Sequence, residues 1–205
     1  MGVYGGTFNP IHNGHIRLAA AWAEHLNLDR LLLIPTNIPP HKRAPDLASG
    51  EDRLEMCRLA GEELQNRTGV PVEASDMELR REGPSYTVDT LKQLHRQMES
   101  LGRRGSLYLI MGGDMFLTLD RWRSPQEIGK LAIACGSARH REEYALLQRQ
   151  AVRLESLGIP ARVLQIEVLE LSSTQLRQMV REGGSLSGLV PAPVERYIGE
   201  KGLYR

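Results

Sequence analysis

The chain has 205 residues, of which 26 are Lys or Arg and 25 are Asp or Glu, so its formal net charge is +1. This balance argues against a general nucleic-acid-binding or membrane-surface protein, because both classes usually carry a basic excess. Hydrophobic residues make up 41% of the chain, which supports a buried core and excludes a disordered protein. No linker interrupts the sequence, and we expect a single domain over residues 1–205.

Strands and helices are predicted to alternate along the chain. Short apolar runs predict strands at 3–4, 31–34, 107–111, 131–135 and 162–166. Three of these runs are continuously apolar, which is typical of strands buried on both faces of a parallel sheet. Apolar residues at helical spacing predict helices around 16–26, 54–64 and 88–94, and the polar stretch 139–149 predicts a solvated helix. The alternation indicates an α/β fold with a Rossmann-like, doubly wound parallel sheet and flanking helices.

The cysteines and the lack of long apolar runs indicate in which cellular compartment we expect the protein. Cys57 and Cys135 stand among core-type residues and cannot make a disulfide framework, so we expect two buried, reduced thiols. The chain contains no C-x-x-C pair, so we predict no structural zinc site. No apolar run approaches the ~18 residues of a membrane helix, and the first six residues lack a signal-peptide pattern. We therefore expect a soluble, cytoplasmic protein.

The most specific segment is Gly5–His15, GGTFNPIHNGH, between the first predicted strand and the first helix. Open α/β sheets bind ligands at this position. Gly5 and Gly6 let backbone amides approach a polyanion, and the helix N-terminus adds unpaired N–H groups. His12 and His15 can lie on one side and donate to phosphate oxygens. The segment predicts a phosphate site, although it is neither a Walker loop nor a G-x-G-x-x-G motif.

Two other interpretations of this segment are possible. The glycines and the Asn9-Pro10 pair can form a plain turn with incidental histidines. Alternatively, His12 and His15 can chelate a metal, as in a hydrolase, but no H-E-x-x-H motif or evident third ligand accompanies them. We therefore favour the phosphate site and predict no protein-bound metal.

The segment resembles the signature of the H-x-G-H nucleotidyltransferases, which join a nucleoside triphosphate to a phosphorylated acceptor and release pyrophosphate. A second signature of that superfamily, I-S-S-T-x-[IV]-R, is similar to residues 171–177, LSSTQLR. Ser172 and Gln175 also form a capping-box pattern there. A capped helix start can still bind a triphosphate.

Further segments resemble one branch of the superfamily, the bacterial nicotinate mononucleotide adenylyltransferases. They are PTNIPPHK at 35–42, PSYTVDTL at 84–91, MGGD at 111–114 followed by Trp122, and the terminal GLYR at 202–205. The resemblance covers nearly the whole chain. It implies ATP and nicotinate mononucleotide as substrates, Mg²⁺ accompanying ATP, and neither nucleic acid nor a membrane as partner. The sequence leaves the oligomeric state open.

The resemblance also implies roles for individual residues, with His12, His15 and Arg177 as the catalytic set. The implied ATP contacts are Gly6, Thr7, Phe8, His12, Gly14, His15, Gly112, Asp114, Ser173, Thr174 and Arg177. The implied mononucleotide contacts are Asn37, Lys42, Tyr86, Thr87 and Trp122. Because the 5′-phosphate of the mononucleotide is already an anion, we expect direct in-line attack without a covalent intermediate.

The chain departs from the family pattern at several positions. Asn9 stands where aspartate is commoner, Leu171 replaces isoleucine, and Arg123 stands where relatives can carry tyrosine. His140 follows Arg139 where proline is frequent, so we leave Arg139 out of the predicted site.

Plain structural roles stay open for some of the implied residues. Tyr86 and Trp122 can be packing aromatics, Asp114 can cap a helix starting at Met115, and Lys42 can be a solvated charge. Two further functions also remain. A pantetheine-phosphate adenylyltransferase would be shorter and lack the S-Y-T segment, and a nucleotide sensor would have lost a phosphate-site histidine or arginine.

Overall fold

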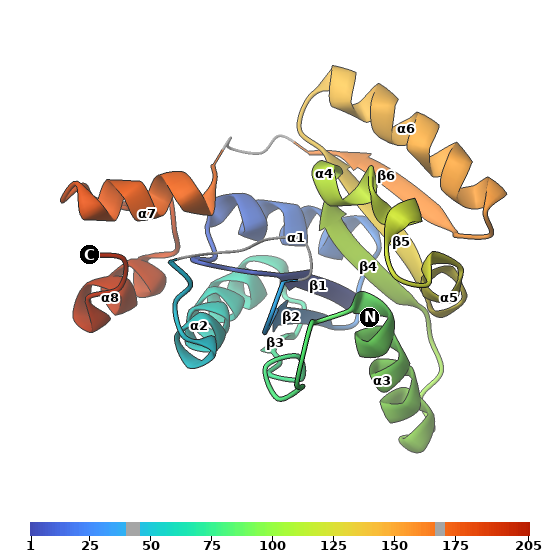
Figure 1. Cartoon of the computed structure of the whole chain (residues 1–205), viewed down its shortest axis with the longest axis horizontal. Helices are drawn as coiled ribbons and strands as arrows, with labels where there is room; N and C mark the ends of the chain where they lie inside the picture. Colours follow the sequence, from blue (N-terminus) through green and yellow to red (C-terminus); the bar gives the residue numbers. More distant parts are fainter. Residues whose placement is uncertain (40–45, 167–170) are drawn as a thin grey trace.

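The centre of the protein is a six-stranded, all-parallel sheet with the strand order β3-β2-β1-β4-β5-β6 (Figure 1). The computed structural model describes residues 1–39, 46–166 and 171–205. The strands are β1 (Gly2–Gly6), β2 (Leu31–Pro35), β3 (Val72–Ala74), β4 (Leu107–Gly112), β5 (Ala132–Ala138) and β6 (Ala161–Gln165). This is the strand order of a doubly wound Rossmann sheet, so the predicted fold class is confirmed.

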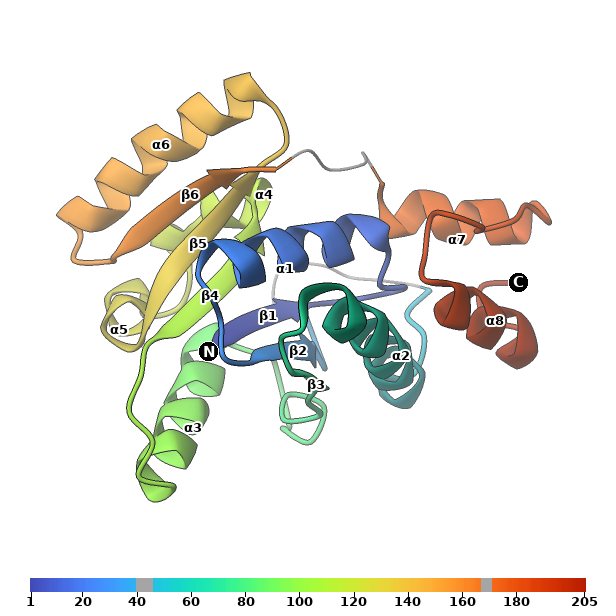
Figure 2. The same cartoon turned by 180° about the vertical axis from the view of Figure 1, so that it is seen from behind.

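Helices cover both faces of the sheet (Figures 1 and 2). They are α1 (Asn13–His25), α2 (Gly50–Thr68), α3 (Thr87–Ser100), α4 (Gly113–Phe116), α5 (Pro125–Leu131), α6 (Arg141–Ser156), α7 (Ser173–Arg181) and α8 (Ala192–Lys201), with a 3₁₀ turn, η1, at Leu119–Arg121. Alternate strand residues face opposite layers. Tyr4 packs in a core with α1, α2, α7 and α8, whereas Val3 packs in a second core with α3, α4, α5 and α6.

The predicted strands agree with the structure, with small shifts at their ends. β5 begins at Ala132 because Leu131 is the last residue of α5. The sequence analysis missed β3, which has only three residues at the sheet edge and too little periodicity to be detected. The helix predicted over 139–149 corresponds to α6, which begins at Arg141 and continues to Ser156. It is solvated on one face only, because Leu147 and Leu154 are fully buried.

Side-chain caps are observed at the starts of α2 and α7, and the one at α7 confirms the prediction for Ser172 and Gln175. The backbone N–H of Asp52 donates to Ser49 Oγ at 3.0 Å at the start of α2. At the start of α7, the N–H of Gln175 donates to Ser172 Oγ at 3.2 Å, and the N–H of Ser172 donates to Gln175 Oε1 at 3.1 Å. The second pair completes a capping box.

Both cysteines are buried and free, as expected. Burial raises the pKa of Cys57 and raises that of Cys135 to about 12, so both thiols stay protonated at neutral pH. Within the described parts of the chain, every helix is too short or too polar to cross a membrane.

The topology determines where a ligand can bind. All six strands are parallel, so their carboxyl ends lie along one edge of the sheet. The strand order reverses between the neighbours β1 and β4, and open α/β sheets bind ligands in the crevice at such a point. The segments that follow β1 and β4 contain Thr7 and Asp114, two of the predicted ATP contacts.

Candidate active site

The loop after β1 makes a tight turn. Phe8 adopts a left-handed backbone conformation with φ 48°, which is uncommon outside glycine, and its ring is buried. The ring packs edge-on against Tyr4 and His15, with centroid distances of 5.4 and 5.2 Å. A Cβ atom at Gly6 would come within 2.9 Å of the Phe8 ring, so this turn requires glycine at position 6.

His12 and His15 lie together at the start of α1, as predicted. His12 is the N-cap residue, and its ring stacks on that of His15 with a centroid distance of 3.7 Å. The backbone N–H of His12 donates to Nδ1 of His15 at 3.2 Å. Because Nδ1 of His15 accepts this bond, a neutral His15 ring carries its proton on Nε2. His15 therefore offers one N–H donor to a ligand.

Burial keeps both histidines neutral at pH 7. It lowers the pKa of His12 to about 4, with a further contribution from the positive charge of Arg139. Burial, His12 and Arg139 hold the pKa of His15 well below its usual value. A bound polyanion would oppose this effect, because negative charge favours the imidazolium form.

Arg139 is a functional candidate that the sequence analysis left out. It follows β5 directly, its charge acts on both histidines, and its Nη2 lies 3.9 Å from Asp114 Oδ2. Arg139 directly follows Ala138, the last residue of β5, so the end of that strand determines where Arg139 stands. Its place immediately after a buried strand was the signal that could have identified it.

The two signature segments meet in space, although more than 160 residues separate them. Ser173 Oγ donates to the carbonyl oxygen of Pro10 at 2.9 Å, and Arg177 Nη1 donates to that of Asn9 at 2.9 Å. Arg177 Nη2 also lies 3.5 Å from Thr174 Oγ1. The predicted association of the two segments is thus observed directly.

Two buried nitrogen atoms in this region lack a hydrogen-bond partner among the described residues. They are Nδ1 of His12 and Nε of Arg177. Buried polar atoms without partners are rare in folded proteins and require an explanation. Phosphate oxygens between the two signature segments would supply acceptors at this place.

Asn9 shows why the chain tolerates its departure from the family pattern. Its Nδ2 donates to the carbonyl of Asp46 at 2.8 Å. Its Oδ1 accepts from the N–H of Ala48 at 3.0 Å and from the hydroxyl of Tyr204 at 2.8 Å. The buried amide therefore uses both its donor and its acceptor, whereas an ionised aspartate could only accept.

The predicted mononucleotide contacts come from several segments: Asn37 follows β2, Tyr86 and Thr87 stand at the start of α3, and Trp122 follows η1. Asn37 Nδ2 donates to the carbonyl of Arg81 at 2.9 Å, and the N–H of Asn37 donates to Ser85 Oγ at 3.0 Å. Tyr86 is the N-cap residue of α3, and Thr87 is its first residue. The hydrogen bonds of Asn37 join the loops after β2 and before α3, while Lys42 lies outside the described residues.

Aromatic and cationic side chains gather beside the start of α3. The guanidinium carbon of Arg123 lies 4.4 Å from the centroid of the Tyr86 ring, within the range of a cation–π contact. The indole N–H of Trp122 donates to Thr118 Oγ1 at 3.3 Å. Arg123, where relatives can carry tyrosine, thus covers a face of Tyr86.

The structure also places Gly112, Asp114 and Gly14. Gly112 is the N-cap residue of α4, and Asp114, in the first turn, has an 81% exposed side chain. The alternative role of Asp114 as the cap of a helix from Met115 is therefore wrong. Gly14 is buried in the first turn of α1.

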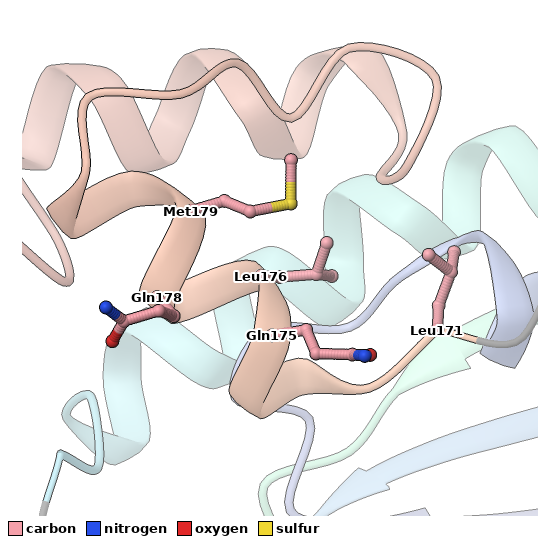
Figure 3. Close-up of a pocket in the computed structure, with 5 residues that line it drawn as sticks. All are labelled: Leu171, Gln175, Leu176, Gln178 and Met179. Atoms are coloured by element: carbon pink, nitrogen blue, oxygen red, sulfur yellow. The ribbon is translucent and has the colours of Figure 1, made fainter.

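Other features of the described residues do not extend the site. They contain no group of three or more His, Cys, Asp and Glu side chains that could hold a metal ion. A shallow, largely apolar pocket lies along α7 (Figure 3). It is lined by Leu171, Gln175, Leu176, Gln178 and Met179, none of which is a predicted contact.

Comparison with known proteins identifies the family. The cytidylyltransferase-like family matches residues 3–179. A curated relative from Desulfatibacillum aliphaticivorans, named probable nicotinate-nucleotide adenylyltransferase, is 38% identical over 100% of this chain and 99% of its own length. A relative of the same name from Sodalis glossinidius is 38% identical over 98% of this chain and 95% of its own. The chain belongs to the nicotinate-nucleotide adenylyltransferase family.

Solved structures support the same fold. A Plasmodium falciparum nicotinic acid mononucleotide adenylyltransferase complexed with APC matches with a TM-score of 0.73 and 15% identity, covering 99% of this chain and 96% of that one. A structure of the same enzyme complexed with NaAD matches with a TM-score of 0.72 and 16% identity. As a member of the adenylyltransferase family, the chain is a nucleotidyltransferase with a Rossmann-like fold.

Proposed function

We propose that this enzyme transfers the adenylyl group of ATP to nicotinate mononucleotide, forming nicotinate adenine dinucleotide and pyrophosphate in NAD biosynthesis. Full-length relatives with this activity in their names support the choice of substrates. The observation that carries the site assignment is the direct contact of Ser173 and Arg177 with the loop that leads into His12 and His15. This contact encloses a region of N–H donors that suits a triphosphate.

In the proposed mechanism, the first signature segment holds ATP by its phosphates. Within the described residues, the backbone N–H groups of Thr7 and Phe8 donate to no acceptor, so both can bind a phosphate oxygen. His15 donates through Nε2, and His12 adds a second ring donor. These groups are fixed before ATP binds, so they stabilise the charge that develops on departing pyrophosphate without reorganising.

The second signature segment approaches the triphosphate from the start of α7. Ser173 and Thr174 lie in the first turn, where unpaired N–H groups carry partial positive charge. Arg177 keeps one nitrogen on the Asn9 carbonyl, and its buried Nε remains for the ligand. Gly112 and Asp114 would contact the adenosine ribose at the end of β4.

The mononucleotide would bind beside the loops after β2 and before α3. Trp122 and Tyr86 would contact the pyridine ring, Asn37 and Lys42 would line the pocket, and amides near Thr87 would meet the nicotinate carboxylate. The 5′-phosphate is already anionic, so no base is needed, and attack proceeds in line on the α-phosphorus without a covalent intermediate. Catalysis then consists of positioning and electrostatic stabilisation.

ATP would arrive with a divalent metal, and we propose Mg²⁺. The phosphate oxygens of ATP are hard ligands of the kind that Mg²⁺ prefers. The protein groups around the proposed triphosphate site are mainly N–H donors, which suit phosphate oxygens, so we assign no protein ligand to the metal. The two free, buried cysteines fit a reducing compartment, and we place the reaction in the cytoplasm.

The decisive experiment supplies ATP and Mg²⁺ with nicotinate mononucleotide, nicotinamide mononucleotide or phosphopantetheine and follows pyrophosphate release. We expect release with nicotinate mononucleotide. Release only with phosphopantetheine would show that the proposed acceptor is wrong, while the proposed adenylyl transfer from ATP would still hold. No release with any acceptor, with ATP still bound, would support a sensor instead.

A further inference from the structure

Arg53 is a buried cation that the proposed mechanism does not use. It lies in the first turn of α2, and only 1% of its surface is exposed. Its Nε donates to the carbonyl of Ala48 at 3.1 Å, and its Nη1 donates to the carbonyls of Thr7 at 3.0 Å and Thr36 at 2.6 Å. One guanidinium group therefore binds three backbone carbonyls from separate parts of the chain.

Two of these carbonyls belong to the proposed site, one in each half. Thr7 lies in the phosphate-binding loop after β1, and Thr36 precedes Asn37 in the loop after β2. Ala48 precedes the Ser49 cap of α2. The N–H of Thr36 also donates to the carbonyl of Gly6 at 2.9 Å, so the loops after β1 and β2 already touch where Arg53 reaches them.

The charge of Arg53 is not offset by a carboxylate among the described residues. Its observed partners are carbonyl oxygens, and burial lowers its pKa without neutralising it. Burying a cation without a carboxylate partner lowers the stability of the fold. A buried polar network whose members are all hydrogen-bonded makes the structure more specific and more rigid. The five N–H groups of a guanidinium, held in a rigid fork, suit it to fixing several carbonyls at once.

We propose that Arg53 is a positioning residue for both substrates: its buried guanidinium holds the ATP-side loop at Thr7 and the mononucleotide-side loop at Thr36 in one fixed relation. The role rests on the proposed function, since it assigns the two loops to the two substrates. It acts through backbone and requires no contact between Arg53 and either substrate. Loss of Arg53 should therefore impair the use of both substrates together.

The test compares Arg53→Ala and Arg53→Lys with two controls on the same helix. Leu64→Ala removes a fully buried side chain remote from the loops and so controls for lost stability. Arg58→Ala removes an exposed arginine that pairs with Glu55 and Glu62. Each variant is assayed for pyrophosphate release where circular dichroism shows it folded, with the KM measured for each substrate, and with and without added methylguanidinium.

We expect Arg53→Ala to lower kcat/KM for both substrates about 100-fold, the scale of a small misplacement of reacting groups. Methylguanidinium should restore part of this loss in Arg53→Ala alone. The kcat/KM of Arg53→Lys should lie between those of Arg53→Ala and the original protein, because a single ammonium group keeps the charge but cannot reach all three carbonyls. Leu64→Ala and Arg58→Ala should keep both KM values within about twofold of the original protein.

Several results would overturn the proposal. One is a kcat/KM of folded Arg53→Ala within about threefold of the original protein, and another is a loss matched by Leu64→Ala. If Arg53→Ala does not fold, unchanged KM values in Arg53→Lys are decisive against it. Equilibrium binding of ATP alone tests this role separately from the proposed reaction, and we expect it to be weaker in the Arg53 variants. Failure of the proposed reaction would instead appear as no pyrophosphate release from the unmodified enzyme.

Discussion

The phosphate-binding loop after β1, on the ATP side, and the mononucleotide side of the proposed site differ in how deeply they are buried. On the ATP side, Phe8, Asn9 and His12 are at most 5% exposed and are held by stacking and by contacts with α7 and the C-terminal segment. On the mononucleotide side, Ile38 is 50% exposed and Arg123 lies on the surface over Tyr86. The difference suits the ligands. Phosphates undergoing transfer need preorganised donors, whereas a flat ring needs mainly a stacking surface.

This comparison leads to different expectations for the two halves. Substitutions on the buried side should lower kcat or the stability of the fold, because they disturb groups fixed before substrate binds. Substitutions on the exposed side should raise the KM for the mononucleotide and leave ATP use unchanged.

The largest effect is expected for His15→Ala. It removes the Nε2 donor, and we expect kcat to fall by at least ~100-fold, the scale of losing one donor to a developing charge. Steady-state pyrophosphate release measures this, with His25→Ala, an exposed histidine later in α1, as control. A turnover within about twofold of the original enzyme would remove His15 from the catalytic set.

His12 should make the fold sensitive to acid. Its folded pKa of about 4 lies below its unfolded value of 6.5, so the unfolded state takes up the proton first as the pH falls. Its contribution, about 3 kcal/mol, is fully present above pH 6.5 and is lost progressively toward pH 4. Urea unfolding across this range should show a flatter pH profile for His12→Asn. An identical profile would refute the burial argument for this residue.

Arg177→Ala should weaken the use of ATP more than that of the mononucleotide. Losing charge-assisted hydrogen bonds of roughly 1.5–3 kcal/mol corresponds to a 10- to 100-fold lower kcat/KM for ATP. Gln178→Ala is the matched control, because the side chain of Gln178 donates to Glu182 at the end of α7 and not to the loop after β1 in the described residues. Equal losses for both substrates would instead indicate that Arg177 mainly holds the Asn9 loop.

The smallest effect should come from Trp122→Ala. Loss of a stacking surface, worth about 1–3 kcal/mol per ring, should raise the KM for the mononucleotide roughly tenfold. Trp122→Phe should retain most of the affinity, and the KM for ATP should stay unchanged in both. A rise in the ATP KM would contradict the division of the site into two halves.

Much of the fold was predictable because its signals are local. Short apolar runs identified five strands, and Ser172 with Gln175 marked a helix start by capping chemistry that needs only neighbouring residues. β3 was missed because three residues at a sheet edge carry too little pattern. The site was predictable in part, since both signature segments were recognised before their contact was seen.

The remaining site residues depend on contacts that no local pattern records. Arg139 influences both histidines only because β5 ends beside β4, and Tyr204 reaches Asn9 across 195 positions of the chain. Arg53 looks like an ordinary charge in the first turn of a helix until its burial and its three carbonyl partners are known.

The sequence by itself determined the parallel α/β fold, the family and the two segments that meet at the proposed phosphate site. Periodicity and signature residues are written along the chain, so they can be read without coordinates. Only the tertiary structure decided that the neutral rings of His12 and His15 stack, that Asn9 uses both ends of its amide, and that Arg53 joins the two loops. Burial, charge environment and hydrogen-bond partners come from residues distant in sequence, and only folding brings these together.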